Sequence, residues 1–211
     1  MIRIMLVDDH AVVRTGFRLL LQSRADMSVI GEAESGEAAY QRYVEWKPDV
    51  VVMDLAMPGM GGLEALRRIR ARDPQAKVLT LSAHDDAAHV RHALQEGALG
   101  FLSKRSAPET LLDAVATVAA GRRYLDAAVA QKLALSEFNG APKAPVDHLT
   151  EREFEVFVRL AHGATVQRIA QDLKLSASTV GTHLYNIKQK LGAVTQSDLT
   201  LIAIRNGVIE A

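Results

Sequence analysis

Short apolar runs alternate with longer amphipathic stretches throughout the first 121 residues, and this alternation constrains the fold more than any other feature. Each run has the length and composition of a buried strand. The stretches between the runs place apolar residues every three or four positions, which is typical of helices that pack on a sheet. Strands and helices in this order form a parallel sheet through right-handed crossovers. We therefore predict a doubly wound α/β domain whose five parallel strands span residues 2–7, 27–32, 49–53, 77–82 and 100–103.

The second half of the chain has a different pattern, which predicts a second and smaller domain. Residues 122–147 begin with a short helical pattern and end in a stretch rich in proline, glycine and asparagine, which is typical of a linker. The segments that follow all have helical spacing. We predict an α/β domain over residues 1–121, a partly helical linker over 122–147, and a small all-α domain over 148–211.

Composition excludes several classes of protein. The chain has 211 residues, 48% of them hydrophobic, and its formal net charge is zero. It contains no cysteine, which excludes disulfides and thiolate metal sites. Its apolar runs are too short to span a membrane, and its first ten residues lack the hydrophobic core of a secretory signal. We predict a cytoplasmic protein without a membrane partner.

Charged and polar side chains occur at the ends of four predicted strands. Asp8 and Asp9 follow the first strand, Asp54 follows the third, Ser82 ends the fourth, and Lys104 follows the fifth. The carboxyl ends of parallel strands meet at one edge of a sheet, where ligands bind. We therefore expect three carboxylates, a hydroxyl and an ammonium group to gather at this edge. The alternative is that these carboxylates are unrelated and lie in solvated loops. The presence of all five groups, each in the expected order along the chain, disfavours this alternative.

These five side chains together suit phosphoryl transfer. Three carboxylates in close contact repel one another, and a divalent cation removes that repulsion. All-oxygen ligands favour Mg²⁺, which binds one or two carboxylates together with water and phosphate oxygens. Asp54 lies in the centre of the sheet, before a glycine-rich loop, and suits the nucleophile. Lys104 and Ser82 suit the remaining oxygens of the phosphoryl group.

The segments "MLVDDHAVVRTGF", "VVVMDLAMPGMGGLEAL", "VLTLSAH" and "GALGFLSK" closely resemble the receiver domain of two-component response regulators, a resemblance that covers the first 121 residues. It implies a flavodoxin-like fold in which Asp54 is the phosphoacceptor and Lys104 binds the phosphate. It implies a switch in which Ser82 and Phe101 respond to phosphorylation. Arg105 stands where the family often has proline, so no cis peptide bond is predicted there. The implied ligands of Mg²⁺ are Asp8, Asp9, Asp54 and the backbone carbonyl of Ala56.

The phosphoryl group must come from another molecule, because the chain has no Gly-x-x-x-x-Gly-Lys-[Ser/Thr] loop for ATP. The resemblance implies a sensor histidine kinase, or a small acyl phosphate, as the donor. It also implies that the protein is not an enzyme, apart from slow self-catalysed phosphotransfer and dephosphorylation at Asp54. The rival is a Mg²⁺-dependent phosphohydrolase, which normally has a second acid two residues after the nucleophile, where this chain has Ala56.

Residues 165–192 have the pattern of a helix-turn-helix. A short amphipathic helix is followed by a tight turn and by a second helix, for which Ser176 is the predicted N-cap. Apolar residues of the second helix recur at spacings of four, three and four, so they face inward. The outward face carries small and polar side chains that suit base edges and phosphates. We predict that DNA is contacted by Ser178, Thr179, Thr182, Tyr185, Asn186, Lys188 and Gln189.

The segment "LTEREFEVFVRLAHGAT…IAQDLKLSASTVGTHLYNIKQKLGA" is similar to the LuxR-type output domain over residues 148–207. With the receiver it resembles response regulators of the NarL/FixJ type. This resemblance implies a transcriptional regulator whose phosphorylated form binds double-stranded DNA as a homodimer. The alternative is an output domain that contacts only other proteins.

Two features of the output segment bear on DNA affinity and dimerisation. Gln167 and Gly181 replace lysines that are common in the family, so we expect weak DNA binding by the monomer and a stronger need for a dimer. Leu199, Ile202 and Ala203 either form a dimer face or pack inside the domain, and the sequence leaves both open.

Overall fold

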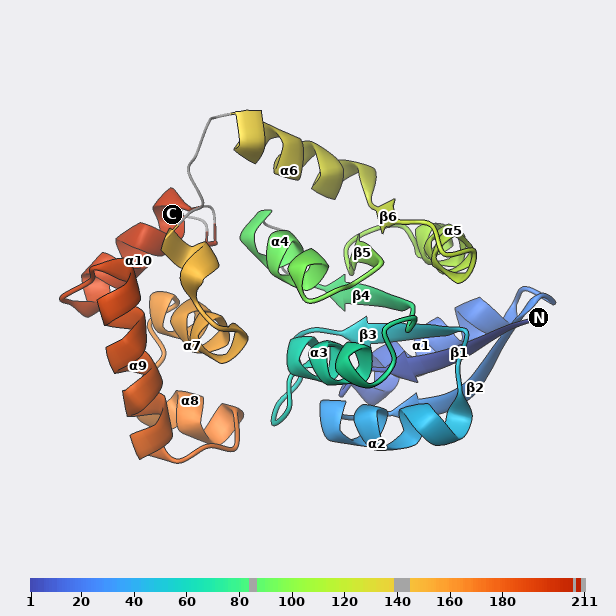
Figure 1. Cartoon of the computed structure of the whole chain (residues 1–211), viewed down its shortest axis with the longest axis horizontal. Helices are drawn as coiled ribbons and strands as arrows, with labels where there is room; N and C mark the ends of the chain where they lie inside the picture. The colour runs from blue at the N-terminus through green and yellow to red at the C-terminus, as the bar shows by residue number, and fades with distance from the viewer. Residues whose placement is uncertain (84–86, 139–144, 207, 210–211) are drawn as a thin grey trace. The chain divides into compact units, whose positions relative to one another are not determined.

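The computed structural model describes residues 1–83, 87–138, 145–206 and 208–209. The chain divides into two compact units, one of residues 1–85 with 93–130 and one of residues 86–92 with 131–211. Among the described residues, all strands belong to the first unit, and the second unit is helical (Figure 1). Six residues of the predicted linker, 139–144, lie outside the described residues.

The first unit contains a sheet of six parallel strands in the order β2-β1-β3-β4-β5-β6. Helices cover both faces of this sheet, and its inner strands are therefore almost continuously apolar. Every residue of β3 is buried, including its final aspartate. The predicted doubly wound α/β fold is confirmed. The strands span Ile2–Val7 (β1), Met27–Ala33 (β2), Val50–Asp54 (β3), Val78–Ser82 (β4), Gly100–Ser103 (β5) and Tyr124–Leu125 (β6).

Alternate side chains of the central strands face different helices. Ile4 and Leu6 of β1, with Val50 and Val52 of β3, lie in one apolar cluster with residues of α1 and α5. On the opposite face, α2 and α3 pack against each other. This arrangement leaves the carboxyl edge of the sheet for the loops. The helices span Ala11–Gln22 (α1), Gly36–Trp46 (α2), Gly62–Arg72 (α3), Ala87–Gln95 (α4) and Pro108–Ala119 (α5).

The sheet has one strand more than the five predicted. Strand β6 has only two residues, and it pairs with β5 at Gly100 and Phe101. A two-residue strand is too short to show an alternating pattern, so no periodicity predicts it. Asp126 directly follows β6, and its carboxylate accepts bonds from the backbone N–H of Ala128 at 2.9 Å and from the hydroxyl of Ser106. Asp126 thereby ties the β5–α5 loop to the start of α6 (Ala127–Phe138).

Four helices and a short 3₁₀ turn form the helical bundle of the second unit, and hydroxyl side chains begin each helix. The predicted N-cap is confirmed, because Ser176 Oγ accepts a hydrogen bond from the backbone N–H of Thr179 at 3.0 Å. No described helix is both long enough and apolar enough to cross a membrane. The elements span Pro145–His148 (η1), Glu151–Ala161 (α7), Val166–Asp172 (α8), Ala177–Leu191 (α9) and Gln196–Arg205 (α10).

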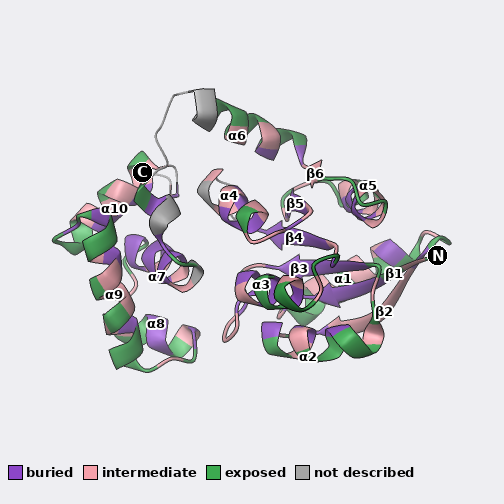
Figure 2. Ribbon diagram, in the orientation of Figure 1, coloured by how far each residue is buried: buried purple, intermediate pink, exposed green. Residues whose placement is uncertain are grey.

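The three apolar residues of α10 that suited either a dimer face or the core, Leu199, Ile202 and Ala203, all contact the core of the bundle. Leu199 and Ala203 have no solvent exposure, and Ile202 packs against the same apolar cluster. The buried faces of α7, α9 and α10 turn toward one another in Figure 2. Leu199 and Ala203 thus close the core of a small bundle, which is the internal-packing alternative, and Ile202 remains partly exposed.

Candidate functional site

The carboxyl edge of the sheet gathers the acidic residues that the sequence predicted there. Asp8 and Asp9 follow β1, and Asp54 is the last residue of β3. Carboxylate oxygens of these three residues and a ring nitrogen of His10 all lie within 4.8 Å of one another. Asp8 is completely buried, and Asp54 is 1% exposed. Such a concentration of buried negative charge needs a cation.

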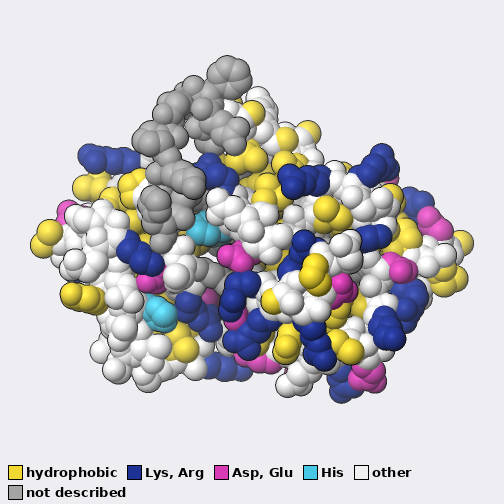
Figure 3. Space-filling model, viewed as in Figure 1, with side chains coloured by type: hydrophobic (Ala, Val, Ile, Leu, Met, Phe, Trp, Pro, Cys, Tyr) yellow, Lys and Arg dark blue, Asp and Glu magenta, His cyan; other side chains and the backbone are white. Residues whose placement is uncertain are grey.

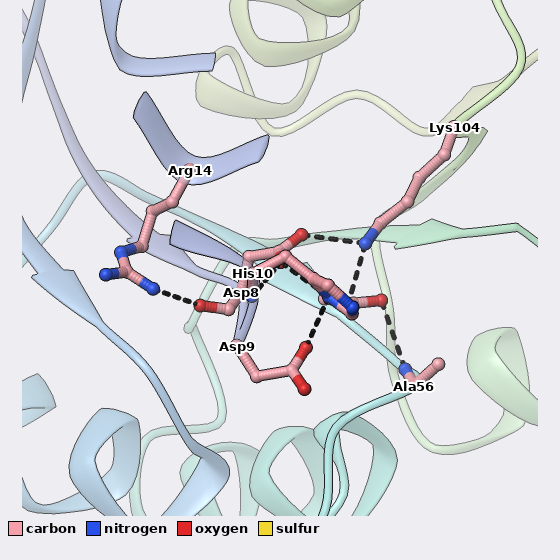
Figure 4. A network of polar contacts seen from close by, with 7 residues as sticks. Asp8, Asp9, His10, Arg14, Ala56 and Lys104 are labelled. Atoms are coloured by element: carbon pink, nitrogen blue, oxygen red, sulfur yellow. Dashed lines mark hydrogen bonds and ion pairs between the residues drawn. The ribbon is translucent and has the colours of Figure 1, made fainter. Parts of the chain in front are cut away.

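Lys104 is the cation that contacts two of these carboxylates (Figure 4). Its Nζ lies 2.7 Å from Oδ2 of Asp8 and 2.8 Å from Oδ2 of Asp54. Burial by itself would lower the pKa of Lys104, but the negative charge of Asp54 and the hydrogen bond to Asp8 outweigh it, so this pKa is raised. Lys104 therefore stays charged and balances part of the negative charge.

One carboxylate oxygen of Asp54 lacks a hydrogen-bond partner in spite of its contact with Lys104. The backbone N–H of Ala56 donates to Oδ1 of Asp54 at 3.1 Å. The contact of Lys104 with Oδ2 is an ion pair without hydrogen-bond alignment, so Oδ2 is a buried oxygen lacking a hydrogen-bond partner. Burial raises the pKa of Asp54, and the neighbouring Lys104 opposes this shift. The carboxylate is thus fixed through one oxygen and open to reaction or binding through the other.

Asp9 contributes a second buried oxygen of this kind. Its Oδ1 lies 2.8 Å from Nδ1 of His10, but this contact is not aligned as a hydrogen bond, and the oxygen has no hydrogen-bond partner. Two unsatisfied carboxylate oxygens, on Asp9 and Asp54, therefore lie in one small group of ligands. Oxygen ligands of this type fit a hard divalent cation such as Mg²⁺.

Ser82 lies on β4, which pairs with the strand of Asp54, and Phe101 lies on β5, which pairs with β4. Ser82 ends β4, is 1% exposed, and accepts a backbone hydrogen bond from the N–H of Lys104 at 2.8 Å. Phe101 lies in β5 and is fully buried. The peptide bond between Lys104 and Arg105 is trans. These positions place the predicted hydroxyl and lysine on adjoining strand ends.

The loop after β3 approaches the back of Asp54 very closely at Gly62. A Cβ atom at Gly62 would lie 1.8 Å from the carbonyl oxygen of Asp54, which is far inside contact distance. The backbone N–H of Gly62 also donates to the carbonyl of Leu55 at 3.2 Å. Only glycine permits this close packing of the loop against the strand end.

We expect Gly62→Ala to destabilise the receiver fold by about 1–3 kcal/mol, because the added methyl group forces the Asp54 backbone to move. Urea unfolding followed by circular dichroism measures this change. Gly16→Ala is the matched control, since a Cβ at Gly16 of α1 meets nothing within 4 Å. The control is expected to be neutral or stabilising. Equal stabilities for the two variants would contradict the prediction.

Helix α9 exposes most of the predicted DNA-contacting side chains. Asn186 and Lys188 are partly buried, and the other five side chains are exposed, among them Tyr185 at 64%. The side chains of Thr179 and Ser176 are within hydrogen-bond distance of each other at 2.8 Å, so Thr179 also takes part in the cap. The exposed five are Ser178, Thr179, Thr182, Tyr185 and Gln189.

Both lysines of α9 have partners within the domain. Lys188 Nζ donates to the carbonyl oxygen of Val194 at 2.6 Å, and Lys190 Nζ lies 2.6 Å from Oε2 of the buried Glu153. Burial lowers the pKa of His183, so this ring adds no positive charge near pH 7. In Figure 3 the surface over α9 is mostly uncharged and polar. The sequence could not show that these lysines are engaged, because their partners lie in other segments.

Comparison with known proteins identifies this combination of units. Residues 4–116 match the response regulator receiver domain family, and residues 147–203 match the luxR family of bacterial regulatory proteins. The chain belongs to the two-component response regulators. Its receiver and LuxR-type DNA-binding domain make it a transcriptional regulator of the NarL/FixJ type, as the sequence predicted. The alternative of an output domain for protein contact alone is not favoured.

Similar response regulators match along nearly their whole length. The chain is 38% identical to the response regulator GacA of Pseudomonas protegens, with 100% of this chain and 99% of GacA covered. It is 42% identical to the transcriptional activator protein ExaE of Pseudomonas putida, with 98% and 97% covered. A solved complex of the response regulator RcsB with DNA has a TM-score of 0.62 and 25% identity, and covers 95% of this chain and 96% of RcsB.

Two residues near the acidic pocket of this response regulator were not singled out from the sequence. His10 contacts the carboxylate of Asp9, and the guanidinium of Arg14 reaches the main chain of Asp8. His10 directly follows the acidic pair, so its position was a signal that could have been used. Arg14 lies one turn inside α1, and only the folded geometry brings it to Asp8.

Proposed function

We propose that Asp54 accepts a phosphoryl group from a sensor histidine kinase, and that this modification controls DNA binding by the output domain. One observation carries this proposal. Asp54 is a buried carboxylate with one oxygen fixed by Ala56 and the other lacking a hydrogen-bond partner beside Lys104. A carboxylate that acts as a nucleophile needs a fixed orientation and an oxygen whose lone pair is available for attack.

A Mg²⁺ ion fits the acidic pocket, with Asp8, Asp9, Asp54 and the backbone carbonyl of Ala56 as the proposed ligands. The two buried oxygens without hydrogen-bond partners, on Asp9 and Asp54, support this assignment. When bound, the cation neutralises carboxylate and phosphoryl charge. Asp8 is held in place by the backbone N–H of His10 on Oδ1 and by Lys104 on Oδ2.

The chemical step transfers the phosphoryl group between two side chains. An oxygen of Asp54 attacks the phosphorus of a phosphohistidine, a P–O bond forms, the P–N bond breaks, and its electron pair returns to the imidazole. Lys104 and Ser82 bind phosphoryl oxygens, so Lys104 must exchange a carboxylate contact for a phosphate contact. Asp54 must be ionised to react, and the charge of Lys104 favours that form against the effect of burial.

We propose that this chemistry is slow and self-catalysed, and that the protein is not an enzyme with turnover. A Mg²⁺-dependent phosphohydrolase would need an acid near the position of Ala56, whose methyl side chain cannot move a proton. Sustained hydrolysis of phosphomonoesters at enzymatic rates would favour the phosphohydrolase instead.

Phosphorylation is proposed to act through Ser82 and Phe101 on the output domain and to favour a homodimer that binds two half-sites. RcsB, a similar response regulator, has been solved bound to DNA, which supports DNA as the partner. Exposed side chains of α9 are the proposed contacts to bases and phosphates. Phosphorylation shifts this equilibrium only if the modified receiver favours the DNA-binding state.

The test compares the wild-type chain with Asp54→Asn and with Asp113→Asn, a control on the exposed surface of α5. Each is incubated with acetyl phosphate and Mg²⁺, and intact mass spectrometry measures the gain of one phosphoryl group. We expect labelling of the wild type and the control but not of Asp54→Asn. Genome-wide DNA selection with the same proteins then measures whether labelling increases specific binding. Labelling of Asp54→Asn at the wild-type level would overturn the proposal.

A further inference from the structure

Arg14 of α1 contacts the acidic pocket on the main chain of Asp8, away from Lys104 (Figure 4). Its Nη1 donates to the carbonyl oxygen of Asp8 at 2.7 Å. Its Nε donates to Oε2 of Glu32 at 3.0 Å. The side chains of Arg14 and Glu32 are 17% and 31% exposed, so this ion pair is partly shielded from water. Arg14 is thus fixed between a strand and the loop that carries the acidic pair.

Four separate hydrogen bonds hold Asp8. Arg14 binds its carbonyl oxygen, the backbone N–H of His10 donates to Oδ1 at 2.8 Å, and Lys104 Nζ donates to Oδ2 at 2.7 Å. The Asp8 backbone N–H also donates to the carbonyl of Ala33 at 3.2 Å. Among the described residues, Arg14 is the donor that fixes the Asp8 carbonyl, which belongs to the peptide group leading into Asp9. The direction of the Asp9 side chain therefore depends on this contact.

Glu32 keeps Arg14 in this position and balances its charge. Glu32 lies on β2 opposite Leu6 of β1, directly beside the strand that ends at the acidic pair. Its other oxygen, Oε1, lies 3.2 Å from Arg18, one turn further along α1. Within the described part of the chain, the ion pair of Arg18 is with Glu32 and not with Asp8. The two arginines share one carboxylate, but only Arg14 reaches the loop.

We propose that Arg14, held by Glu32, is a positioning residue that presents Asp8 and Asp9 to the divalent cation. The inference rests on the proposed function, because it concerns the same Mg²⁺ site. Groups that orient metal ligands from behind affect metal affinity although they never touch the metal. A guanidinium donates through two N–H groups in a fixed plane, so it defines the peptide orientation better than a lysine does.

The test measures Mg²⁺ affinity of the full chain by isothermal titration calorimetry, and phosphorylation by acetyl phosphate as a function of Mg²⁺ concentration. For Arg14→Gln we expect roughly tenfold weaker Mg²⁺ binding, the lower end for groups that orient metal ligands. The maximal phosphorylation rate at saturating Mg²⁺ is expected to remain near the wild-type value. Arg14→Lys is expected to recover only part of the affinity.

Arg18→Gln is the matched control, because it removes a partner of Glu32 without touching Asp8, and it is expected to bind Mg²⁺ like the wild type. Circular dichroism in EDTA checks that every variant is folded. Equal Mg²⁺ affinity of Arg14→Gln and wild type, or an equal loss in both arginine variants, would overturn the inference. If the wild type itself binds no Mg²⁺, the proposed function has failed, which is a distinct result.

Discussion

In metal-free buffer, Lys104→Met is expected to be less stable than the wild type by about 3 kcal/mol. Removing one partner of a buried ion pair typically costs 3–5 kcal/mol, because the remaining charge is left without compensation. Lys104 is 17% exposed and contacts Asp8 and Asp54, which are almost completely buried. Methionine keeps the length and apolar stem of lysine, so the loss reports on the charge.

The loss of stability in Lys104→Met is expected to grow as pH rises. Burial raises the pKa of Asp54 above its usual value, and Lys104 opposes that shift, so the variant raises this pKa further. A carboxyl group whose pKa is higher in the folded state destabilises that state as pH rises through this pKa. The difference in free energy of unfolding between variant and wild type is therefore expected to be larger at pH 8 than at pH 5.

Mg²⁺ is expected to restore much of the stability that Lys104→Met loses, because the cation replaces the missing positive charge. Urea unfolding with EDTA and with Mg²⁺ measures both effects. Arg105→Met is the control, since it removes the charge of the neighbouring residue, which is exposed. A Lys104→Met variant as stable as Arg105→Met in EDTA would show that Lys104 does not balance the pocket.

The acidic pocket was predictable because each of its groups stands at a strand end. The apolar run of β3 located Asp54, and the parallel topology brought Asp8, Asp9 and Lys104 to the same edge. Strand periodicity thus specified the site before any distance was known. The contact between Arg14 and the Asp8 carbonyl was not predictable, because it depends on how α1 packs beside β2.

Other features had no signature in a single segment of the sequence. Strand β6 is too short for a periodic pattern, and it forms because β5 offers an open edge. Leu199 and Ala203 fit either a dimer face or a core, since both are apolar positions of one amphipathic helix. Periodicity shows which face of a helix is apolar, but not what covers that face.

A substitution of Gly181 by lysine is expected to have a large effect on the affinity for DNA. This residue lies in the middle of α9, and a Cβ there would meet nothing within 4 Å. The nearby lysines, Lys188 and Lys190, are bound to Val194 and Glu153, so a new cation would add charge that the helix lacks. Gly181→Lys is expected to bind duplex DNA about tenfold more tightly at low salt, as one added phosphate contact allows.

Gly181→Ala separates the two causes of this gain. Alanine removes the helix cost of glycine, about 1 kcal/mol, but adds no charge. Fluorescence anisotropy with a fixed duplex at several salt concentrations measures affinity and its salt dependence. The slope of log affinity against log salt is expected to steepen by about 0.9 for Gly181→Lys and to stay unchanged for Gly181→Ala. Equal slopes for the two variants would mean that position 181 does not face the phosphate backbone.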